Sequence, residues 1–268
     1  MTHERIYFYP EDKRVYLDTY IADERRNGPR DAMVIFPGGA YIAVCADREG
    51  EPIAISYLSR GINSFVVKYS NDEDAIFPRQ LLDGVRAVVH VKENAEKYNI
   101  DPERVFVSGF SAGGHLAGTV TTLYKYASSI LGCDEELCKV RGAVLAYPVV
   151  SAYPPTHITS IEKLFKKSYS EISEEEKNLT SLERNIDEKT PPMFIWHTAT
   201  DQIVPPYGSI MLTNAYCNLH RSVAFHLYPY GLHGAALANE ITNVEGVCKA
   251  IPEAEGWLED SVFWMKTV

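Results

Sequence analysis

The sequence has no long hydrophobic run. No apolar stretch comes near the roughly 18 residues needed to cross a bilayer. The first residues, MTHERIYFYPEDKRVY, contain no apolar segment of the kind found in secretory signals. A membrane-spanning or exported protein is therefore not indicated, and we expect a cytoplasmic protein without a membrane partner.

Cysteines in the pattern of a disulfide framework or a zinc site are missing. The chain has five cysteines, an odd number, and none stands in a C-x-x-C pair. Scattered cysteines of this kind are best interpreted as free thiols. They are Cys45, Cys133, Cys138, Cys217 and Cys248.

Patterns typical of metal and nucleotide sites are also missing. No helical pattern carries the H-E-x-x-H spacing of zinc hydrolases, and acidic clusters such as 174–176 indicate solvated surface. No predicted strand is followed by the glycine-rich phosphate loop of nucleotide-binding proteins. We therefore expect neither a metal nor any cofactor.

Basic residues are too few to balance the acidic ones. Lys and Arg number 26 against 36 Asp and Glu, which gives a formal net charge of -10. A surface of this sign repels nucleic acid and anionic membranes, so we expect neither as a partner. Neutral small molecules, acylated sugars among them, are not repelled.

Short apolar runs rich in β-branched and aromatic residues alternate with longer helical patterns. This indicates βαβ units and a largely parallel sheet, the α/β class, in one domain over 1–268. Two strands of an N-terminal hairpin are expected at 6–9 and 15–21. Further strands are predicted at 31–36, 63–69, 104–108, 142–147, 193–197 and 223–228, with helices at 77–98, 112–126, 209–219 and 255–266.

The stretch 149–192 departs from this alternation. It begins with Val-Val-Ser-Ala-Tyr-Pro-Pro and continues into a charged region, 162–188, with sparse apolar positions. We interpret it as an insertion of short helices packed over the edge of the sheet. A charged segment is most often a solvated face, but its place between two late strands makes it a candidate lid or substrate wall.

The strongest chemical signal is Gly109-Phe-Ser-Ala-Gly113, which matches the G-x-S-x-G pattern. It lies between a predicted strand and a predicted helix, where a sharp turn would hold the Ser111 hydroxyl outward. The flanking glycines let neighbouring backbone pass without Cβ clashes. We predict that Ser111 is a nucleophile; the alternative is a Gly-Ser turn without a catalytic role.

A serine nucleophile needs N–H groups that stabilise the oxyanion of its tetrahedral intermediate. The N–H of Ala112 follows the nucleophile at a helix start, where the dipole favours negative charge. Gly38 and Gly39 follow the predicted strand 31–36 and leave space for an oxyanion beside their N–H groups. We predict that these three residues form the oxyanion hole; a simple Gly-Gly turn is the alternative.

An acid and a base should follow the nucleophile in the order Ser, acid, His. Asp201 and His233 each come shortly after a predicted strand, at the carboxyl edge of the sheet. Imidazole can accept the serine proton at neutral pH, and a carboxylate can hold its tautomer. We predict His233 as the base and Asp201 as the acid; Asp187 or Glu188 could replace Asp201 only if the insertion folded back.

The remaining histidines fit other roles. His115 lies one turn into the helix that follows Ser111, and we expect it to pack or to form hydrogen bonds. His197 and His226 lie inside predicted strands, where a core or supporting role is expected. No special role is expected for His3, His90, His157 and His220.

Four segments together resemble a known family. The sequence, from about Asp31 to about Leu237, is similar to the small bacterial acetyl esterases called acetylxylan esterase-like or BD-FAE-like, which are related to hormone-sensitive-lipase-like esterases. The resemblance implies the α/β-hydrolase fold and hydrolysis of a small-molecule ester through an acyl-enzyme. The segments are Pro37-Gly-Gly-Ala-Tyr41, Gly109-Phe-Ser-Ala-Gly-Gly-His-Leu-Ala117, Trp196-His-Thr-Ala-Thr-Asp201 and Gly231-Leu-His-Gly234.

Two positions depart from the relatives that carry H-G-G-G. Pro37 replaces the histidine, which favours the acetyl-esterase group over true lipases, and Ala40 replaces the third glycine. Its methyl would narrow the acyl site, so the resemblance implies a short acyl group, acetyl above all. We further expect Tyr41 and Tyr147, with the stretch 147–155, to line an alcohol pocket suited to acetylated sugars or xylo-oligosaccharides.

Other functions stay open at this point. A lipase should have a large apolar lid, whereas the insertion is charged, and a peptidase of this fold usually carries an added propeller domain. A catalytically silent binding protein is disfavoured because each position of the predicted triad holds the right residue type. The alcohol of the ester and a homo-oligomeric state are not decided by the sequence.

Overall fold

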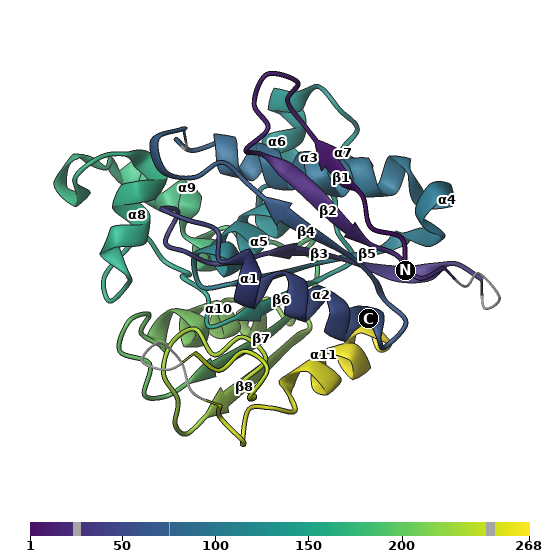
Figure 1. The fold of residues 1–268 in the computed structure, drawn as a ribbon. Helices are drawn as coiled ribbons and strands as arrows, with labels where there is room; N and C mark the ends of the chain where they lie inside the picture. The colour runs from purple at the N-terminus through teal and green to yellow at the C-terminus, as the bar shows by residue number, and fades with distance from the viewer. Residues whose placement is uncertain (24–27, 75, 245–249) are drawn as a thin grey trace.

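Eight strands form one sheet in the computed structural model, which describes residues 1–23, 28–74, 76–244 and 250–268 (Figure 1). They are β1 (Arg5–Tyr7), β2 (Tyr16–Tyr20), β3 (Arg30–Phe36), β4 (Asn63–Lys68), β5 (Ile100–Phe110), β6 (Ala143–Ala146), β7 (Met193–Thr198) and β8 (Val223–Tyr228). Their order is β1-β2-β4-β3-β5-β6-β7-β8. β2 pairs antiparallel with β1 and β4, and all other neighbours are parallel.

The central strands are buried on both faces, which explains their continuous apolar runs. Successive side chains of β3 point to opposite sides of the sheet. Val34 and Phe36 belong to one core cluster, whereas Met33 and Ile35 belong to the other. The predicted α/β class and the N-terminal hairpin are both confirmed.

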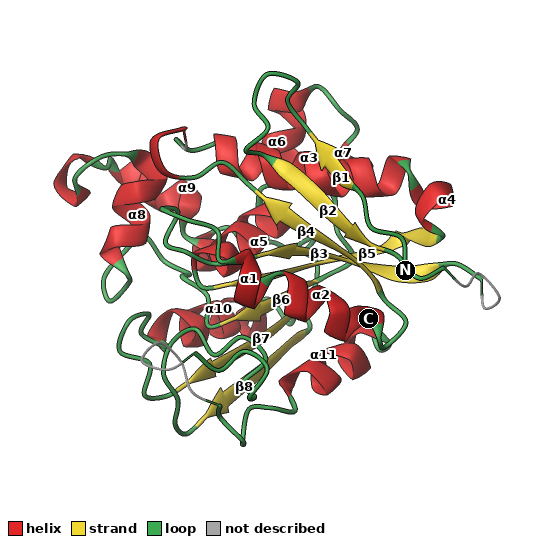
Figure 2. Cartoon of the chain, in the orientation of Figure 1, coloured by secondary structure: helices red, strands yellow, loops and turns green. Residues whose placement is uncertain are grey.

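Helices cover both faces of the sheet (Figure 2). They are α1 (Ala46–Glu49), α2 (Glu51–Leu58), α3 (Arg79–Glu93), α4 (Ala95–Tyr98), α5 (Ala112–Thr122), α6 (Tyr124–Leu131), α7 (Glu135–Cys138), α8 (Ile158–Phe165), α9 (Glu174–Thr180), α10 (Tyr207–Asn218) and α11 (Trp257–Met265). On one face α3, α5 and α10 contribute Val88, Leu116 and Leu212 to the core. On the other, α2 and α11 contribute Tyr57 and Trp257.

Some predicted elements have different bounds in the structure. The helix predicted at 112–126 is interrupted at Leu123, and its second part, α6, runs on to Leu131. The strand predicted at 104–108 is longer, because β5 begins at Ile100. Its register against β3 shifts between Arg30 and Ala32, which accommodates Pro102 outside the regular ladder.

The insertion 149–192 contains the short helices predicted for it. They are α8, α9 and two 3-10 turns, η2 (Tyr169–Glu171) and η3 (Leu182–Arg184), and a third turn, η1 (Asp72–Asp74), lies earlier in the chain. In Figure 1, α8 and α9 lie together at one end of the sheet. The insertion is more than a solvated face, because Leu164, Phe165 and Leu182 are buried in the core.

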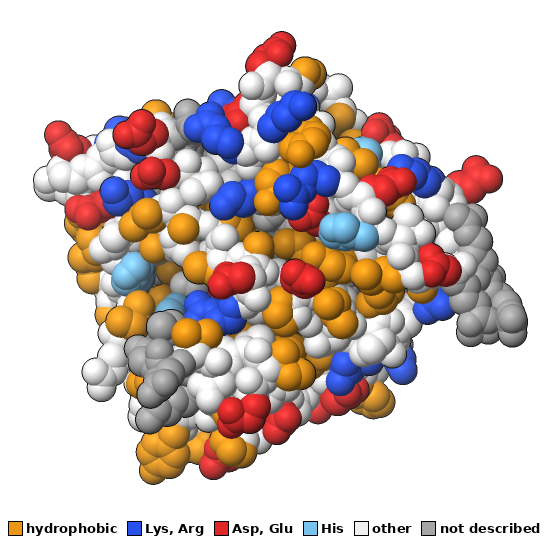
Figure 3. Space-filling view, in the orientation of Figure 1, with side chains coloured by type: hydrophobic (Ala, Val, Ile, Leu, Met, Phe, Trp, Pro, Cys, Tyr) orange, Lys and Arg blue, Asp and Glu red, His pale blue; other side chains and the backbone are white. Residues whose placement is uncertain are grey.

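One face of the molecule carries charges of both signs. Figure 3 shows acidic and basic side chains interspersed with apolar atoms over one face. No helix among the described residues is both long and apolar enough to span a bilayer. Four of the cysteines are free thiols, with the sulfurs of Cys133 and Cys138 lying 3.0 Å apart, and Cys248 lies outside the described residues.

Candidate active site

Ser111 stands in a sharp turn between β5 and α5. Its backbone angles, φ 55° and ψ −120°, are unfavourable for a residue with a side chain. A Cβ on Gly109 would collide with the carbonyl group of Gly113, and one on Gly113 would collide with the carbonyl oxygen of Phe36. Close approach of the backbone therefore requires both glycines, as the pattern predicts.

Backbone hydrogen bonds to the end of β6 hold this strained turn. The N–H of Ser111 donates to the carbonyl of Ala146 at 3.0 Å. The carbonyl of Ser111 accepts from the N–H groups of Val149 and His115, both at 3.1 Å. The turn is thus fixed on both sides by neighbouring segments.

Ser111, His233 and Asp201 form a continuous chain of hydrogen bonds. The Nε2 atom of His233 lies 2.7 Å from the Oγ of Ser111, and its Nδ1 lies 2.6 Å from the Oδ2 of Asp201. The Asp201 side chain is fully buried, while that of His233 is 14% exposed. The structure brings together three predicted residues that are far apart in the sequence.

Asp201 is surrounded by hydrogen-bond donors. Its Oδ1 accepts from the N–H groups of Ile203 at 2.9 Å and Val204 at 3.0 Å, and its Oδ2 also faces the Nε2 of His197 at 3.2 Å. Burial raises the pKa of this carboxyl, but the hydrogen bonds from His197, His233 and Val204 outweigh it, so the pKa of Asp201 lies well below its usual value. Asp201 is therefore ionised at neutral pH.

His197 has the supporting position expected of a histidine inside a strand. Its Nε2 lies 3.0 Å from the carbonyl oxygen of Val204, which can only accept, so this nitrogen carries the proton. Its Nδ1 then accepts from the hydroxyl of Ser209 at 2.9 Å. The ring is thereby held in one tautomer that donates toward Asp201.

His115 forms hydrogen bonds inside the core, as expected. Its Nε2 donates to the carbonyl of Thr180 in the insertion at 2.7 Å. Its Nδ1 therefore accepts from the hydroxyl of Tyr41, also at 2.7 Å. Complete burial lowers the pKa of His115 to about 4, although the bond to Thr180 opposes the shift. A neutral imidazole in this position connects the insertion to the loop after β3.

The alternative base and acids lie in other surroundings. His226 is partly exposed on β8, where its Nδ1 lies 3.9 Å from Asp260. Asp187 accepts from the hydroxyl of Thr190 within its own turn, and Glu188 is exposed. The hydrogen bond between His233 and Asp201 thus favours Asp201 over Asp187 and Glu188 as the acid.

The loop after β3 lies against the nucleophile. A Cβ on Gly38 would lie 3.0 Å from the Cβ of Ser111. The N–H of Gly38, however, donates to the Oε2 of Glu49 at 2.7 Å. This differs from the prediction that the Gly38 N–H serves an oxyanion, because a proton bound to a buried carboxylate is not available to another anion.

Other N–H groups, in the same loop and directly after Ser111, are available. Among the described residues, the N–H groups of Gly39, Ala40 and Ala112 have no hydrogen-bond acceptor. Gly39 has φ 132° and Ala40 has φ 55°, so the loop turns tightly at this point. Gly39 and Ala112, both predicted for the oxyanion hole, thus have N–H groups that no other acceptor among the described residues occupies.

The two tyrosines expected in an alcohol pocket are buried in the core instead. Tyr41 is 1% exposed, and its ring packs between Tyr69 and His115. Tyr147 is 2% exposed, and its ring lies 4.9 Å from that of His233. Neither ring forms an open wall, which corrects the expectation. The reason is that both hydroxyls have buried partners, so the rings turn inward.

Two functional candidates escaped the sequence analysis. Glu49 is a buried carboxylate that contacts the loop after β3. His157, at the start of α8, lies near enough to the triad for both His233 and Asp201 to influence it; burial and then His233 lower the pKa of His157. No spacing rule relates position 49 or 157 to Ser111, because only the folded chain brings them there.

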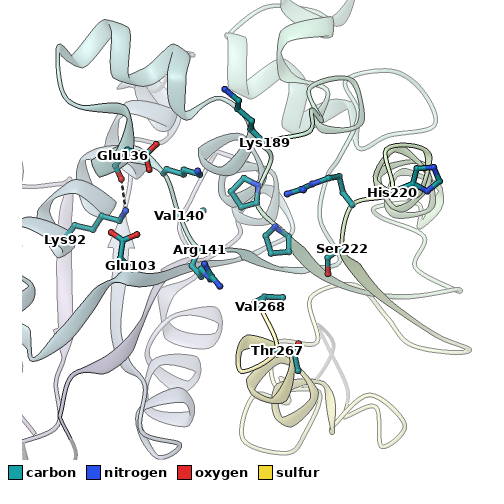
Figure 4. Close-up of a pocket in the computed structure, with 14 residues that line it drawn as sticks. Lys92, Glu103, Glu136, Val140, Arg141, Lys189, His220, Ser222, Thr267 and Val268 are labelled. Carbon is teal, nitrogen blue, oxygen red and sulfur yellow. Dashed lines mark hydrogen bonds between the residues drawn. The ribbon is translucent and has the colours of Figure 1, made fainter.

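A separate groove of about 560 Å³ lies at the starts of β6, β7 and β8, away from Ser111 (Figure 4). Lys92 and Arg141 line it together with Glu103. The Nζ of Lys92 donates to the backbone carbonyl of Glu136 at 2.8 Å. The mixed charges of its lining, which includes none of Ser111, Asp201 and His233, distinguish it from the candidate active site.

Comparisons with known proteins agree with this architecture. The sequence profile of the family described as BD-FAE matches residues 17–216. The chain is 34% identical over 218 residues to endo-1,4-beta-xylanase B of Butyrivibrio fibrisolvens, covering 79% of this chain and 33% of that protein. It is 28% identical over 210 residues to an acetylxylan esterase of Xylanibacter ruminicola, covering 76% and 40%. The chain thus spans between a third and two-fifths of the length of these curated relatives.

A solved structure matches almost the whole chain. The acetyl ester-xyloside bifunctional hydrolase of Caldicellulosiruptor lactoaceticus superposes with a TM-score of 0.84 at 28% identity. The match covers 99% of this chain and 96% of that one. The predicted α/β-hydrolase fold is therefore confirmed.

Proposed function

The chain belongs to the BD-FAE family of α/β-hydrolase esterases, and on this premise we propose that it is a serine carboxylesterase acting on short-chain esters, above all acetyl esters. The observation that carries the proposal is the hydrogen-bonded chain from Ser111 through His233 to Asp201, at 2.7 and 2.6 Å. Such an arrangement activates a serine hydroxyl for acyl transfer.

In the first step, the Oγ of Ser111 attacks the ester carbonyl carbon while the Nε2 of His233 accepts the hydroxyl proton. The imidazolium that forms is stabilised by the ionised Asp201, which also holds the Nδ1–H. His233 then gives the proton to the departing alkoxide, so that the alcohol leaves and the acyl group stays on Ser111.

The oxyanion of the tetrahedral intermediate requires donors that are already oriented. We assign this role to the N–H groups of Gly39 and Ala112, with that of Ala40 beside them. Their lack of other acceptors among the described residues supports the assignment. Gly38 acts indirectly, since its N–H is held by Glu49.

In the second step, water attacks the acyl-enzyme. His233 takes a proton from the water and returns it to the Oγ of Ser111 as the acid leaves. The cycle uses only the protein and water.

The acyl group is proposed to be small. Ala40 carries a methyl group in the oxyanion loop, in a backbone conformation with φ 55°. The acetyl esterase activities in the names of two proteins it resembles, from Xylanibacter and Caldicellulosiruptor, support an acetyl group. The same names support an O-acetylated saccharide or xylo-oligosaccharide as a substrate class. A lipase, a peptidase or a silent binding protein is the alternative.

A fluorophosphonate probe tests the enzyme assignment. It should label the wild-type protein and Ser108→Ala, a matched change in β5 three residues before the nucleophile, but not Ser111→Ala. No labelling of folded wild-type protein would rule out the serine-hydrolase assignment.

Initial rates on nitrophenyl acetate, butyrate and octanoate, beside acetylated xylo-oligosaccharide, test the substrate class. Acetate should be the best of the three synthetic esters. Octanoate as the best substrate would contradict the short-acyl proposal and favour a lipase.

A further inference from the structure

A buried carboxylate connects the two loops that surround the nucleophile. Glu49, the last residue of α1, is 2% exposed. Its Oε2 accepts the N–H of Gly38 at 2.7 Å, and its Oε1 accepts the hydroxyl of Tyr147 at 2.9 Å. The guanidinium of Arg48 lies 3.7 Å from Oε1. Burying a carboxylate is costly, so the buried position of Glu49, with two hydrogen bonds accepted there, calls for an explanation.

On one side, Glu49 fixes the oxyanion loop. The carbonyl of Pro37 accepts from the hydroxyl of Tyr69 at 2.7 Å, and the next N–H, that of Gly38, is held by Glu49. The peptide plane between Pro37 and Gly38 is therefore fixed at both its oxygen and its hydrogen. Since the direction of the Gly39 N–H depends on the backbone just before it, this plane sets where the proposed oxyanion donor points.

On the other side, Glu49 reaches the loop of the base through Tyr147. The Tyr147 hydroxyl donates to Glu49 and accepts the N–H of Ala236 at 2.8 Å, three residues after His233. The Tyr147 ring lies 4.9 Å from the His233 ring at an interplanar angle of 68°. Burial and then Glu49 raise the pKa of Tyr147 well above its usual value, so its hydroxyl stays a donor.

We propose that Glu49 is a positioning residue that holds the oxyanion loop and, through Tyr147, the His233 loop in register around Ser111. The inference rests on the proposed esterase function. Glu49 forms its hydrogen bonds with Gly38 and Tyr147 and not with Ser111, so it acts through the two loops, and its effect should appear in the rate of the chemical step. A carboxylate suits this role because both of its oxygens accept, whereas a glutamine offers one acceptor and one donor.

The test compares Glu49→Gln and Tyr147→Phe with the control Tyr57→Phe. Tyr57 is also fully buried, and its hydroxyl lies 3.0 Å from the Oγ of Ser261, between α2 and α11. All three changes weaken a buried hydrogen bond, but only the first two touch the proposed network. The measurements are kcat and KM on nitrophenyl acetate, the inhibition constant of a boronic acid, and the melting temperature.

We expect kcat to fall by about tenfold or more in Glu49→Gln and in Tyr147→Phe, with KM within about threefold of wild type, because misplaced oxyanion donors act mainly on the transition state. The boronic acid, which forms a tetrahedral adduct with the serine, should bind more weakly by a similar factor. Tyr57→Phe should lower the melting temperature and leave both kinetic values near wild type.

Two results would overturn the inference: a folded Glu49→Gln with wild-type kcat, or losses of kcat in Tyr57→Phe that match those of the network variants. If Glu49→Gln does not fold, Tyr147→Phe, which keeps the ring, decides by the same criteria. The proposed function itself would be contradicted by a different result. In that case the wild-type protein would be neither labelled by a fluorophosphonate nor active on any ester.

Discussion

The Nε2 of His197 lies 3.2 Å from the Oδ2 of Asp201, the same oxygen that faces the Nδ1 of His233 at 2.6 Å. The carboxylate thus contacts two imidazoles, and its contact with His233 is shorter than its contact with His197. With the N–H groups of Ile203 and Val204 on its second oxygen, Asp201 has little freedom to rotate. This rigidity sets the orientation of the base.

Asp201→Asn should lower kcat by about 10⁴-fold while the protein stays folded. An amide can present an N–H to His233, which would stabilise the wrong tautomer of the imidazole. Steady-state kinetics on nitrophenyl acetate measure the effect. His197→Gln is the companion variant and should cost far less, because it removes a support of Asp201 and leaves the charge in place. An equal loss in both variants would contradict this ranking.

Stability should fall as the pH drops from about 6.5 to about 4, in part because of His115. Its folded pKa of about 4 lies below the ordinary value of 6.5, so the unfolded chain binds a proton that the folded protein does not. The group therefore stabilises the fold above about 6.5 and loses this contribution, about 3 kcal/mol, as the pH reaches 4.

His115→Gln removes this titration and tests the effect. Urea denaturation at a series of pH values should give a shallower decline of the unfolding free energy for the variant than for the wild type. Parallel pH profiles for the two proteins would contradict the prediction, because they would show that folding does not shift the pKa of His115.

Gly38→Ala should damage both stability and activity. The added methyl would lie 2.7 Å from the Oε2 of Glu49 and from the carbonyl oxygen of Phe110, so the loop must shift. Overpacking of this kind costs about 1–3 kcal/mol, and displaced oxyanion donors should lower kcat by about 10²-fold. Gly256→Ala, which meets nothing within 4 Å, is the control for urea denaturation and kinetics. Full activity in Gly38→Ala would mean that the loop does not contribute to the site.

Ala40→Gly should widen the acyl preference. It removes a methyl group from the oxyanion loop and relieves a positive φ of 55°. We expect the ratio of the butyrate to the acetate rate to rise by about tenfold, the lower end of the effect of one methylene in an apolar pocket. Ala238→Gly, at φ 59°, relieves similar strain elsewhere and should leave the ratio unchanged. If the wild type, Ala40→Gly and Ala238→Gly have the same butyrate-to-acetate ratio, the acyl group does not bind beside Ala40.

The meeting of Ser111, Asp201 and His233 could be predicted from the sequence because each comes shortly after a recognisable strand. Ser111 sits in a local pattern with its own steric logic, and parallel strands bring the loops that follow them to one edge of the sheet. Asp201 and His233 needed only the right order and type. Local sequence and topology together therefore determine this part of the site.

Other features depend on contacts that no local pattern encodes. The N–H of Gly38 points to Glu49 because α1, which follows the loop after β3, packs against that loop. The Tyr147 side chain turns inward because its hydroxyl has two buried partners. Residue type alone predicts direct contact with substrate for Gly38 and Tyr147. The buried polar partners that these two residues must satisfy are visible only in the folded chain.

The bridge formed by His115 has a practical consequence for protein engineering. One ring connects the hydroxyl of Tyr41 in the loop after β3 to the carbonyl of Thr180 at the end of α9. A loop transplant that exchanged 149–192 for the corresponding segment of another esterase would leave this imidazole with one partner unless the new backbone offered a carbonyl at the same place. The insertion and helix α5 should therefore be exchanged as one unit, and chimeras that divide them should lose the order of the loop that carries Gly39.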